Sequence, residues 1–243
     1  MDLNGKVVLV AGGAGGIGLG IAKALATEGC RVALADTNEE ALADAVKAVK
    51  GKSQCVGRRC DITDREQVSK LFKWLGSELG PIDILVNSAG INVADRMMSN
   101  ISPDDFDRVM EINTTGTFNC IYAALGVMRQ KGSGLIVNIV SLAGKRVMLL
   151  AGMPYCVSKF ATGALGTFVN LEESANGIKV TNIYPGETNT PIIDKRPSPP
   201  PPEKRAKMLQ PEDIAACVVT IAKLPPRAVV PELVITPPHM MVG

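Results

Sequence analysis

Histidine and paired cysteines, the usual ligands of structural zinc, are almost missing from this sequence. Its single histidine is His239, and its six cysteines are scattered without any Cys-x-x-Cys pair. Zinc sites need several such ligands at short spacing, so we expect no metal site. Scattered free thiols are typical of a reducing compartment, and the first residues lack the apolar core of a secretory signal. We therefore expect a cytoplasmic protein.

An excess of charge of either sign is also missing, and so are long hydrophobic runs. The 243 residues include 26 lysines and arginines against 24 acidic residues, with both signs interspersed. No basic stripe indicates nucleic acid or an anionic membrane surface as a partner. No run approaches the roughly 18 apolar residues that a membrane-spanning helix needs. We therefore expect no nucleic-acid partner and no membrane span.

Short apolar segments alternate with helical patterns along the chain. The predicted strands are 6–12, 31–36, 53–59, 81–87, 135–140, 178–183 and 232–236. The predicted helices start near 17, cover 38–50, follow a cap at Asp64, and then cover 103–131 (two segments joined near Asn113), 155–175 and 211–224. Such alternation indicates a parallel sheet with helices on both faces.

We therefore expect an α/β protein with a doubly wound Rossmann fold of about seven mainly parallel strands. Residues 1–243 are predicted to form one domain, because the interruptions between elements are only of loop size. The segment 190–210 is predicted as a loop on the substrate side. Within it, the proline-rich residues 197–202 are expected to be extended and to form no element.

A glycine-rich turn follows the first predicted strand and precedes a helical pattern. Five glycines fall within residues 12–18. Free backbone N–H groups and the positive end of the helix dipole favour a diphosphate at such a turn. Two registers fit the motif. Gly13-x-Gly15-x-x-Gly18 is the general dinucleotide fingerprint, and Gly12-x-x-x-Gly16-x-Gly18 is the alternative, which the later motifs favour.

Asp36 ends the second predicted strand, eighteen residues after the last glycine of the turn. An acid at about this distance accepts hydrogen bonds from the ribose hydroxyls of NAD, and it would repel the 2′-phosphate of NADP. The residues that follow it directly are not basic. We therefore predict NAD as the cofactor, with NADP less favoured. Arg58 and Arg59 are the nearest residues that could shift this preference toward NADP.

A serine, a tyrosine and a lysine form the main chemical pattern of the chain. Ser141 follows the fifth predicted strand, and Tyr155 and Lys159 stand four residues apart, on one face of a predicted helix. A free tyrosine has a pKa near 10, and an ammonium one turn away favours the phenolate. We predict Tyr155 as the general acid/base, Lys159 as the group that lowers its pKa, and Ser141 as the group that orients a substrate oxygen.

Together these motifs resemble those of the short-chain dehydrogenase/reductase family, in family order and over nearly the whole chain. Asn87-Ser-Ala-Gly90 is similar to the Asn-Asn-Ala-Gly motif of that family, with Ser88 as the departure. The resemblance implies hydride transfer between a nicotinamide cofactor and a secondary alcohol or ketone. It implies that Asn113 seats a water behind Lys159, which would also hold the nicotinamide ribose. The cofactor contacts that it implies are Gly12, Gly15, Gly16, Ile17, Asp36, Asp61, Ile62, Asn87, Ala89, Gly90, Tyr155, Lys159, Pro185, Gly186 and Thr188.

The interval from Ser141 to Tyr155 is one residue longer than is usual in this family. We expect the apolar loop 145–153 to absorb the extra residue. Pro154, directly before the tyrosine, fits the first turn of a helix.

Two apolar segments, 147–153 and Met97–Met98, leave predicted strands at the ends where ligands bind in such sheets. Methionine adapts to irregular apolar ligands, so we expect a mainly apolar ketone or secondary alcohol as substrate. Lys145 and Arg146 leave room for an acidic tail. The alternative is that these segments pack against each other or at a subunit contact.

Small residues in the predicted helix 155–175 would permit close approach of another helix. They are Ala161, Gly163, Ala164 and Gly166. The resembling family builds its main dimer interface from this helix and the 103–131 region, so we expect a homotetramer, with a dimer as second choice. The alternative is that these residues pack against the sheet of their own chain.

Two other functions are compatible with parts of the pattern. A non-catalytic nucleotide-binding scaffold or sensor would keep the fold without needing Ser141, Tyr155 and Lys159. A Rossmann-like methyltransferase would use the glycine turn but has no need of Tyr-x-x-x-Lys.

Overall fold

The described part of the chain folds around one sheet of seven strands, all of them parallel. The computed structural model describes residues 1–49 and 54–240. The strands run in the order β3-β2-β1-β4-β5-β6-β7, and every neighbouring pair is parallel. Their bounds are β1 Val7–Ala11, β2 Arg31–Asp36, β3 Cys55–Arg59, β4 Ile84–Asn87, β5 Gly134–Ile139, β6 Ile178–Pro185 and β7 Glu232–Ile235. The predicted doubly wound fold is confirmed.

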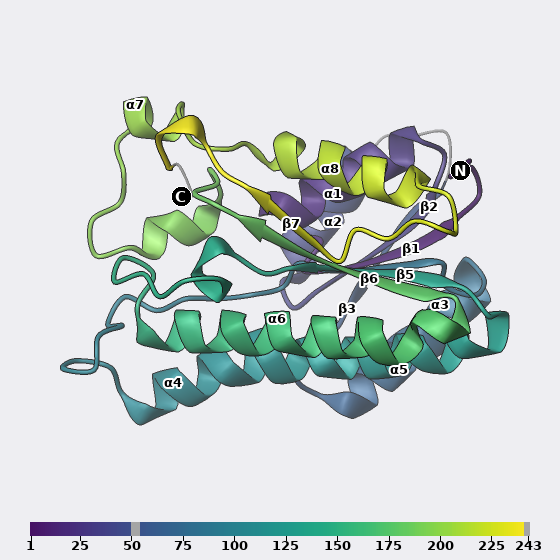
Figure 1. Ribbon diagram of the computed structural model, residues 1–243, viewed down its shortest axis with the longest axis horizontal. Coiled ribbons are helices and arrows are strands. Elements are labelled where there is room, and N and C mark those ends of the chain that lie inside the picture. Colours follow the sequence, from purple (N-terminus) through teal and green to yellow (C-terminus); the bar gives the residue numbers. More distant parts are fainter. Residues whose placement is uncertain (50–53, 241–243) are drawn as a thin grey trace.

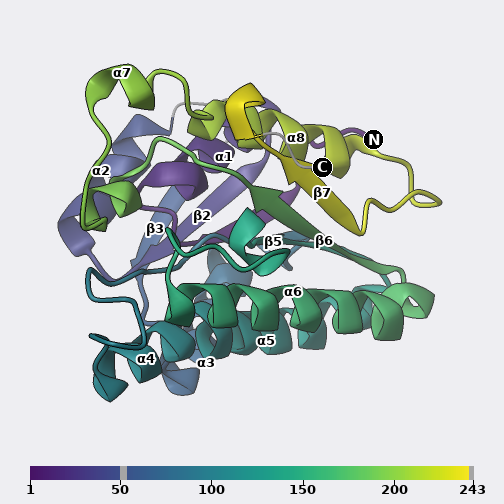
Figure 2. The ribbon, with the colours of Figure 1, turned by 60° about the vertical axis from the view of Figure 1, so that its left-hand side comes forward.

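Helices cover both faces of the sheet (Figure 1). Their bounds are α1 Gly16–Thr27, α2 Glu39–Ala48, α3 Arg65–Glu78, α4 Pro103–Met110, α5 Thr117–Lys131, α6 Met153–Glu173, α7 Pro202–Arg205 and α8 Pro211–Lys223. Helices α1, α2 and α8 lie on one face, and α3, α5 and α6 lie on the other, as the turned view in Figure 2 also shows. The short helix α7 stands apart from both layers.

Strand β1, in the centre of the sheet, is apolar throughout because both of its faces are buried. All five residues of β1 are buried, and its side chains alternate between the two layers. Val8 and Val10 belong to the core cluster under α1, α2 and α8. Leu9 belongs to the cluster under α3 and α5. Burial of each such side chain stabilises the fold by roughly 1.5–3 kcal/mol before the entropy of ordering it is counted.

Several predicted boundaries differ from the structure by a few residues, and two lie outside the described residues. Helix α6 begins at Met153, two residues earlier than expected, and Pro154 lies in its first turn, where proline needs no N–H partner. The stretch 197–202 was expected to form no element, but Pro202 begins the short helix α7 because its ring presets a helical φ. Lys50 and Ser53, at the predicted ends of a helix and a strand, lie outside the described residues.

The long helical segment 103–131 changes its geometry in the middle. A π-helical turn, η1 (Glu111–Gly116), joins α4 to α5 at the place where the sequence predicted a junction. Such turns are rare and often occur at functional sites. At its end Gly116 packs so closely on Ile62 that an added Cβ would lie 2.5 Å from Ile62 Cγ1.

Candidate active site

A cavity of about 740 Å³ lies at the carboxyl ends of the strands, where parallel α/β sheets bind their ligands. Residues from both halves of the sheet wall it. Most of the residues singled out from the sequence are among them: Gly12, Gly15, Gly16, Ile17, Asp36, Asp61, Ile62, Ala89, Gly90, Ser141, Tyr155, Lys159, Pro185, Gly186 and Thr188. Asn87 and Asn113 are predicted site residues that stand behind the wall rather than in it.

The backbone of the glycine turn decides between the two registers of the motif. Gly12 and Gly16 have φ values of 78° and 54°, a region that favours glycine. A Cβ at Gly12 would lie 2.4 Å from the nitrogen of Ala89, and one at Gly18 would lie 2.1 Å from the oxygen of Gly12. The structure therefore favours the Gly12-x-x-x-Gly16-x-Gly18 register.

The N-terminus of α1 fits a dinucleotide diphosphate. Its N-cap residue, Gly15, offers no side chain to the free N–H groups, and no acid lies in the first turn. A Cβ at Gly15 would find no atom within 4 Å, so there is room beside the helix for a phosphate. In contrast, Asn38, Asp64 and Ser102 cap α2, α3 and α4 with their side chains. The uncapped donors of α1 are available to an anion.

Asp36 stands beside this turn at the end of β2. One carboxylate oxygen accepts from the backbone N–H of Ala14, and the other accepts from that of Asn38, each at 3.2 Å. The cap of α2 is Asn38, so capping does not explain the acid at position 36. Arg59 lies in register with Asp36 on the next strand, and its Nε donates to the carbonyl oxygen of Thr37 at 3.3 Å. An acid and a base thus share the edge where the adenosine ribose would lie.

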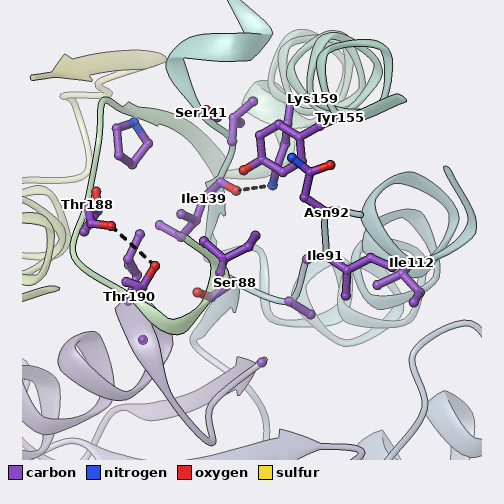
Figure 3. Close-up of a pocket in the computed structure, with 18 of the residues that line it drawn as sticks. Ser88, Ile91, Asn92, Ile112, Ile139, Ser141, Tyr155, Lys159, Thr188 and Thr190 are labelled. Atoms are coloured by element: carbon purple, nitrogen blue, oxygen red, sulfur yellow. Dashed lines mark hydrogen bonds between the residues drawn. The ribbon is translucent and has the colours of Figure 1, made fainter. Parts of the chain in front are cut away.

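Ser141, Tyr155 and Lys159 come together on the opposite wall (Figure 3). Ser141 follows β5, and Tyr155 and Lys159 occupy the first turns of α6. Lys159 is 5% exposed, and its Nζ lies 5.5 Å from the centre of the Tyr155 ring. Ser141 stands close enough to Tyr155 for its hydroxyl to lower the pKa of that side chain, so the longer interval between them does not separate the two groups.

The ionisation of this pair is governed by burial. Burial raises the pKa of Tyr155 to about 12, against the smaller, lowering effects of the neighbouring Ser141 hydroxyl and the charge of Arg196. Burial lowers the pKa of Lys159 to about 8. We expected Lys159 to lower the pKa of the tyrosine, but the net shift is upward, because loss of solvent outweighs the nearby charges.

Asn113 holds the inner side of the site together from the π-helical turn. Its side chain accepts from the backbone N–H of Ile91 at 2.8 Å and donates to Ile91 O and to Ser158 Oγ, each at 3.0 Å. A Cβ at Gly90 would lie 3.3 Å from Asn113 Oδ1 and 3.5 Å from Lys159 Nζ. Asn113 and Lys159 therefore meet behind Gly90, and the predicted water at this place stays a prediction.

Several wall residues were not found from the sequence. They are Asn92, Arg96, Glu187 and Arg196 among the polar ones, and Leu142, Ile192 and Ile193 among the apolar ones. For Asn92 and Glu187, the one signal in the sequence was that each follows a motif at the end of a strand. Arg96 and Arg196 had none, because their approach to the cavity depends on how the loops fold.

The two predicted apolar segments behave differently. Met148, Leu150 and Ala151 line the cavity, but Met97 and Met98 do not, and Met98 is 77% exposed. The prediction that the pair at 97–98 lies at the substrate pocket was therefore wrong. Lys145 pairs with Glu232 and stacks over the ring of Tyr184, away from the cavity wall.

No helix within residues 1–49 and 54–240 is long and apolar enough to cross a membrane. The same residues contain no group of three or more side chains able to hold a metal ion.

The family of the chain follows from comparison with known proteins. A family model described as short chain dehydrogenase matches residues 6–200. The D-threitol dehydrogenase of Mycolicibacterium smegmatis is 36% identical over 228 residues, which cover 90% of this chain and 86% of the relative. Glycine betaine reductase ATRR of Emericella nidulans is 34% identical over 241 residues, or 97% of this chain, but the chain spans only 19% of that protein.

A solved structure agrees with the sequence matches. The alcohol dehydrogenase from the archaeon Thermococcus sibiricus, in complex with 5-hydroxy-NADP, has a TM-score of 0.87 and 25% identity to this protein. The match covers 98% of this chain and 99% of that chain. The fold, the cavity and these likenesses agree: the chain belongs to the short-chain dehydrogenase family and is an NAD(P)-dependent oxidoreductase of alcohol and carbonyl groups.

Proposed function

We propose that this protein transfers hydride between NAD and a secondary alcohol or ketone whose body is mainly apolar. The observation that carries the proposal is that Ser141, Tyr155 and Lys159 wall the same cavity as the uncapped N-terminus of α1. One end of the cavity is suited to a diphosphate and the other to a proton transfer. The bound nicotinamide supplies or accepts the hydride.

The side chains of Tyr155, Ser141 and Lys159 have separate roles in the reaction. In the direction of reduction, the Tyr155 hydroxyl donates its proton to the carbonyl oxygen, and a tyrosine with a raised pKa is fully protonated at neutral pH. The Ser141 hydroxyl donates a hydrogen bond to the same oxygen and holds it in place. Lys159 is anchored by the carbonyl oxygen of Ile139 and keeps two further N–H donors for the nicotinamide ribose.

An apolar substrate is supported by the wall around Tyr155. Leu142, Met148 and Leu150 line the cavity, and η4 (Pro191–Lys195) contributes Ile192 and Ile193 to it. Such surfaces gain binding free energy by removing apolar ligand area from water, at roughly 25 cal/mol per Å². The name of the D-threitol dehydrogenase supports the reaction class, but it concerns a small polyol and so does not support this substrate.

Assembly into a homotetramer or dimer belongs to the same proposal. Exposed apolar side chains, Tyr122 of α5 and Phe168 and Leu171 of α6, are 66–74% exposed and support an interface on this face. Gly163 and Gly166 do not contribute to it. A Cβ at either would contact Tyr184 or Asn182 of β6, so these glycines serve packing within the chain. The cytoplasmic location stays a prediction; all six cysteines are free.

The test is absorbance at 340 nm with NAD and NADP against a panel of alcohols, and with the reduced cofactors against ketones. We expect turnover, with medium-chain or cyclic compounds having the highest kcat/KM. Cofactor binding without any turnover would favour the scaffold or sensor instead. A best kcat/KM for small polyols would refute the apolar substrate while leaving the reaction class intact.

A further inference from the structure

Arg96 is a buried arginine in the wall of the active-site cavity. It is 4% exposed and lies in the loop after β4. Its guanidinium donates to three backbone carbonyl oxygens, those of Ala94, Leu150 and Lys195. A guanidinium carries five N–H donors, so two remain. Within residues 1–49 and 54–240, no carboxylate forms an ion pair with Arg96.

A second arginine stands next to it. The carbonyl of Lys195, which accepts from Arg96, is bonded to the nitrogen of Arg196, and Arg196 lines the same cavity. Arg196 pairs with Glu187 at 2.8 Å, and its side chain is 16% exposed. The other oxygen of Glu187 lies 3.4 Å from His239. This corner of the cavity thus has two guanidinium groups for one carboxylate.

The excess positive charge is costly where it stands. Burial lowers the pKa of Arg96, and the charge of Arg196 lowers it further. A buried charge is normally offset by a partner of opposite sign, and carbonyl dipoles offset it only in part. An anion bound in the cavity would balance the excess positive charge of this corner. The planar guanidinium group can form two parallel hydrogen bonds to a carboxylate.

The corner also stands within electrostatic reach of the reacting group. The charge of Arg196 lowers the pKa of Tyr155, which lines the same cavity. Arg96 donates to the carbonyl oxygen of Leu150, and Asn92 donates to that of Ala151 at 2.9 Å. The arginine corner is therefore joined to the segment that forms part of the apolar wall. The diphosphate site, in contrast, lies at the N-terminus of α1, beside Gly15.

We propose that Arg96 and Arg196 bind a carboxylate of the substrate, so that the enzyme acts on hydroxy acids and oxo acids with an apolar body. This proposal rests on the proposed function and narrows its substrate class. The reacting carbon lies at Tyr155, and the chain of the substrate runs along Met148 and Leu150 to the arginine pair. The competing explanation is structural: Arg96 only ties three loops together, and Arg196 only neutralises Glu187.

The test compares matched pairs of substrates on the full-length enzyme with its cofactor. The pairs are methyl ketones that end in a carboxylate, with four to eight carbons, and the primary amides of the same acids. We expect the wild type to prefer the acid by at least tenfold in kcat/KM at one or more chain lengths. In Arg196→Gln that preference should fall at least tenfold, mainly through a higher KM for the acid. Arg96→Lys keeps the charge but loses the fork, so it should reduce the preference less.

Arg227→Gln is the matched control, because Arg227 is exposed and outside the cavity; it should keep the preference of the wild type. Equal kcat/KM for acid and amide in the wild type, with neutral ketones still reduced, would overturn the carboxylate site and leave the proposed function standing. A weaker NADH affinity in Arg196→Gln with an unchanged acid preference would also overturn it, since the arginine would then serve the cofactor.

If no ketone is reduced, the proposed function fails and the site is judged by binding alone. Hexanoate should then raise the Tm of the NAD complex more than hexanamide does, and Arg196→Gln should remove that difference. An equal effect of the two compounds on the wild type would overturn the proposal.

Discussion

The buried ammonium of Lys159 donates a hydrogen bond to the carbonyl oxygen of Ile139, 2.9 Å away, at the end of β5. This bond fixes the lysine in the wall of the cavity, but it does not replace the water that the charge has lost. The pKa of Lys159 therefore falls from its ordinary 10.5 to about 8.

This shift makes stability depend on pH with a definite sign. Between about pH 8 and 10.5 the unfolded chain binds the Lys159 proton more tightly than the folded one, so this group makes the fold more stable as pH rises. Lys159→Met removes the effect. The free energy of unfolding of the variant minus that of the wild type should fall by roughly 2.5 kcal/mol from pH 7 to pH 10.

Urea unfolding of both proteins across this range measures the difference, and other titrating groups cancel in it. If the unfolding free energy of the variant minus that of the wild type stays constant or grows with pH, Lys159 is not held in a poorly solvated site.

Removal of the Tyr155 hydroxyl should abolish most activity without unfolding the protein. Tyr155→Phe keeps the ring, so the cavity keeps its shape, but no proton reaches the substrate oxygen. We expect kcat to fall by about 10²–10⁴-fold, the usual contribution of general acid–base catalysis. Steady-state assays at 340 nm and circular dichroism would measure this. Tyr122→Phe is the matched control, since Tyr122 is 71% exposed on α5; near-wild-type turnover in Tyr155→Phe would refute the assignment.

Asp36 should give a preference for NAD over NADP. Its carboxylate would face a 2′-phosphate at the end of β2, and we expect kcat/KM for NAD to be at least about tenfold higher, or ~1.4 kcal/mol. Asp36→Ala should reduce the ratio of kcat/KM for NAD to kcat/KM for NADP. Arg59→Ala should increase this ratio, because Arg59 donates to Thr37 O and stands close enough to offset the charge of a 2′-phosphate.

Both cofactors, assayed with one alcohol at varied concentration, give these ratios. Equal or better use of NADP by the wild type would show that Arg59 and not Asp36 sets the preference.

The exposed face of α5 and α6 should hold subunits together. Phe168 and Leu171 are 66% and 74% exposed and stand almost one turn apart on α6. The double substitution Phe168→Asp, Leu171→Asp places two charges on this face and should lower the oligomeric mass, which light scattering at micromolar concentration measures. Val229→Asp, at a 45% exposed valine outside these helices, is the control. A wild type of monomer mass would contradict the predicted assembly.

The fold was largely accessible from the sequence because its signals are local. Apolar runs such as 7–11 and turn glycines such as Gly12 report on the backbone within a few residues. The catalytic spacing of Tyr155 and Lys159 needs only one helix. These features were predicted with element boundaries within a few residues.

The loops of the site were less accessible, because contacts between distant segments shape them. Arg96 reaches the cavity through carbonyls at 94, 150 and 195, a combination that no periodicity reveals. Met97 directly follows Arg96 but does not line the cavity, so the prediction that Met97 and Met98 lie at the substrate pocket was wrong. The direction of the Tyr155 pKa shift was missed for a related reason: spacing shows a neighbouring charge, but burial depends on the whole fold.

The order of strands has a consequence for how the chain acquires its structure during synthesis. The first strand made, β1, is flanked by β2 and β4, so one of its edges stays open until residues 84–87 have left the ribosome. β7 closes onto β6 at the far edge only after residues 232–235 have been made. Long-range pairing of this kind is slow, and unpaired apolar strands invite aggregation. After β4 has paired with β1, the open edge passes to β4, β5 and β6 in turn, so an unpaired apolar strand edge persists until the next strand of the sheet has been translated.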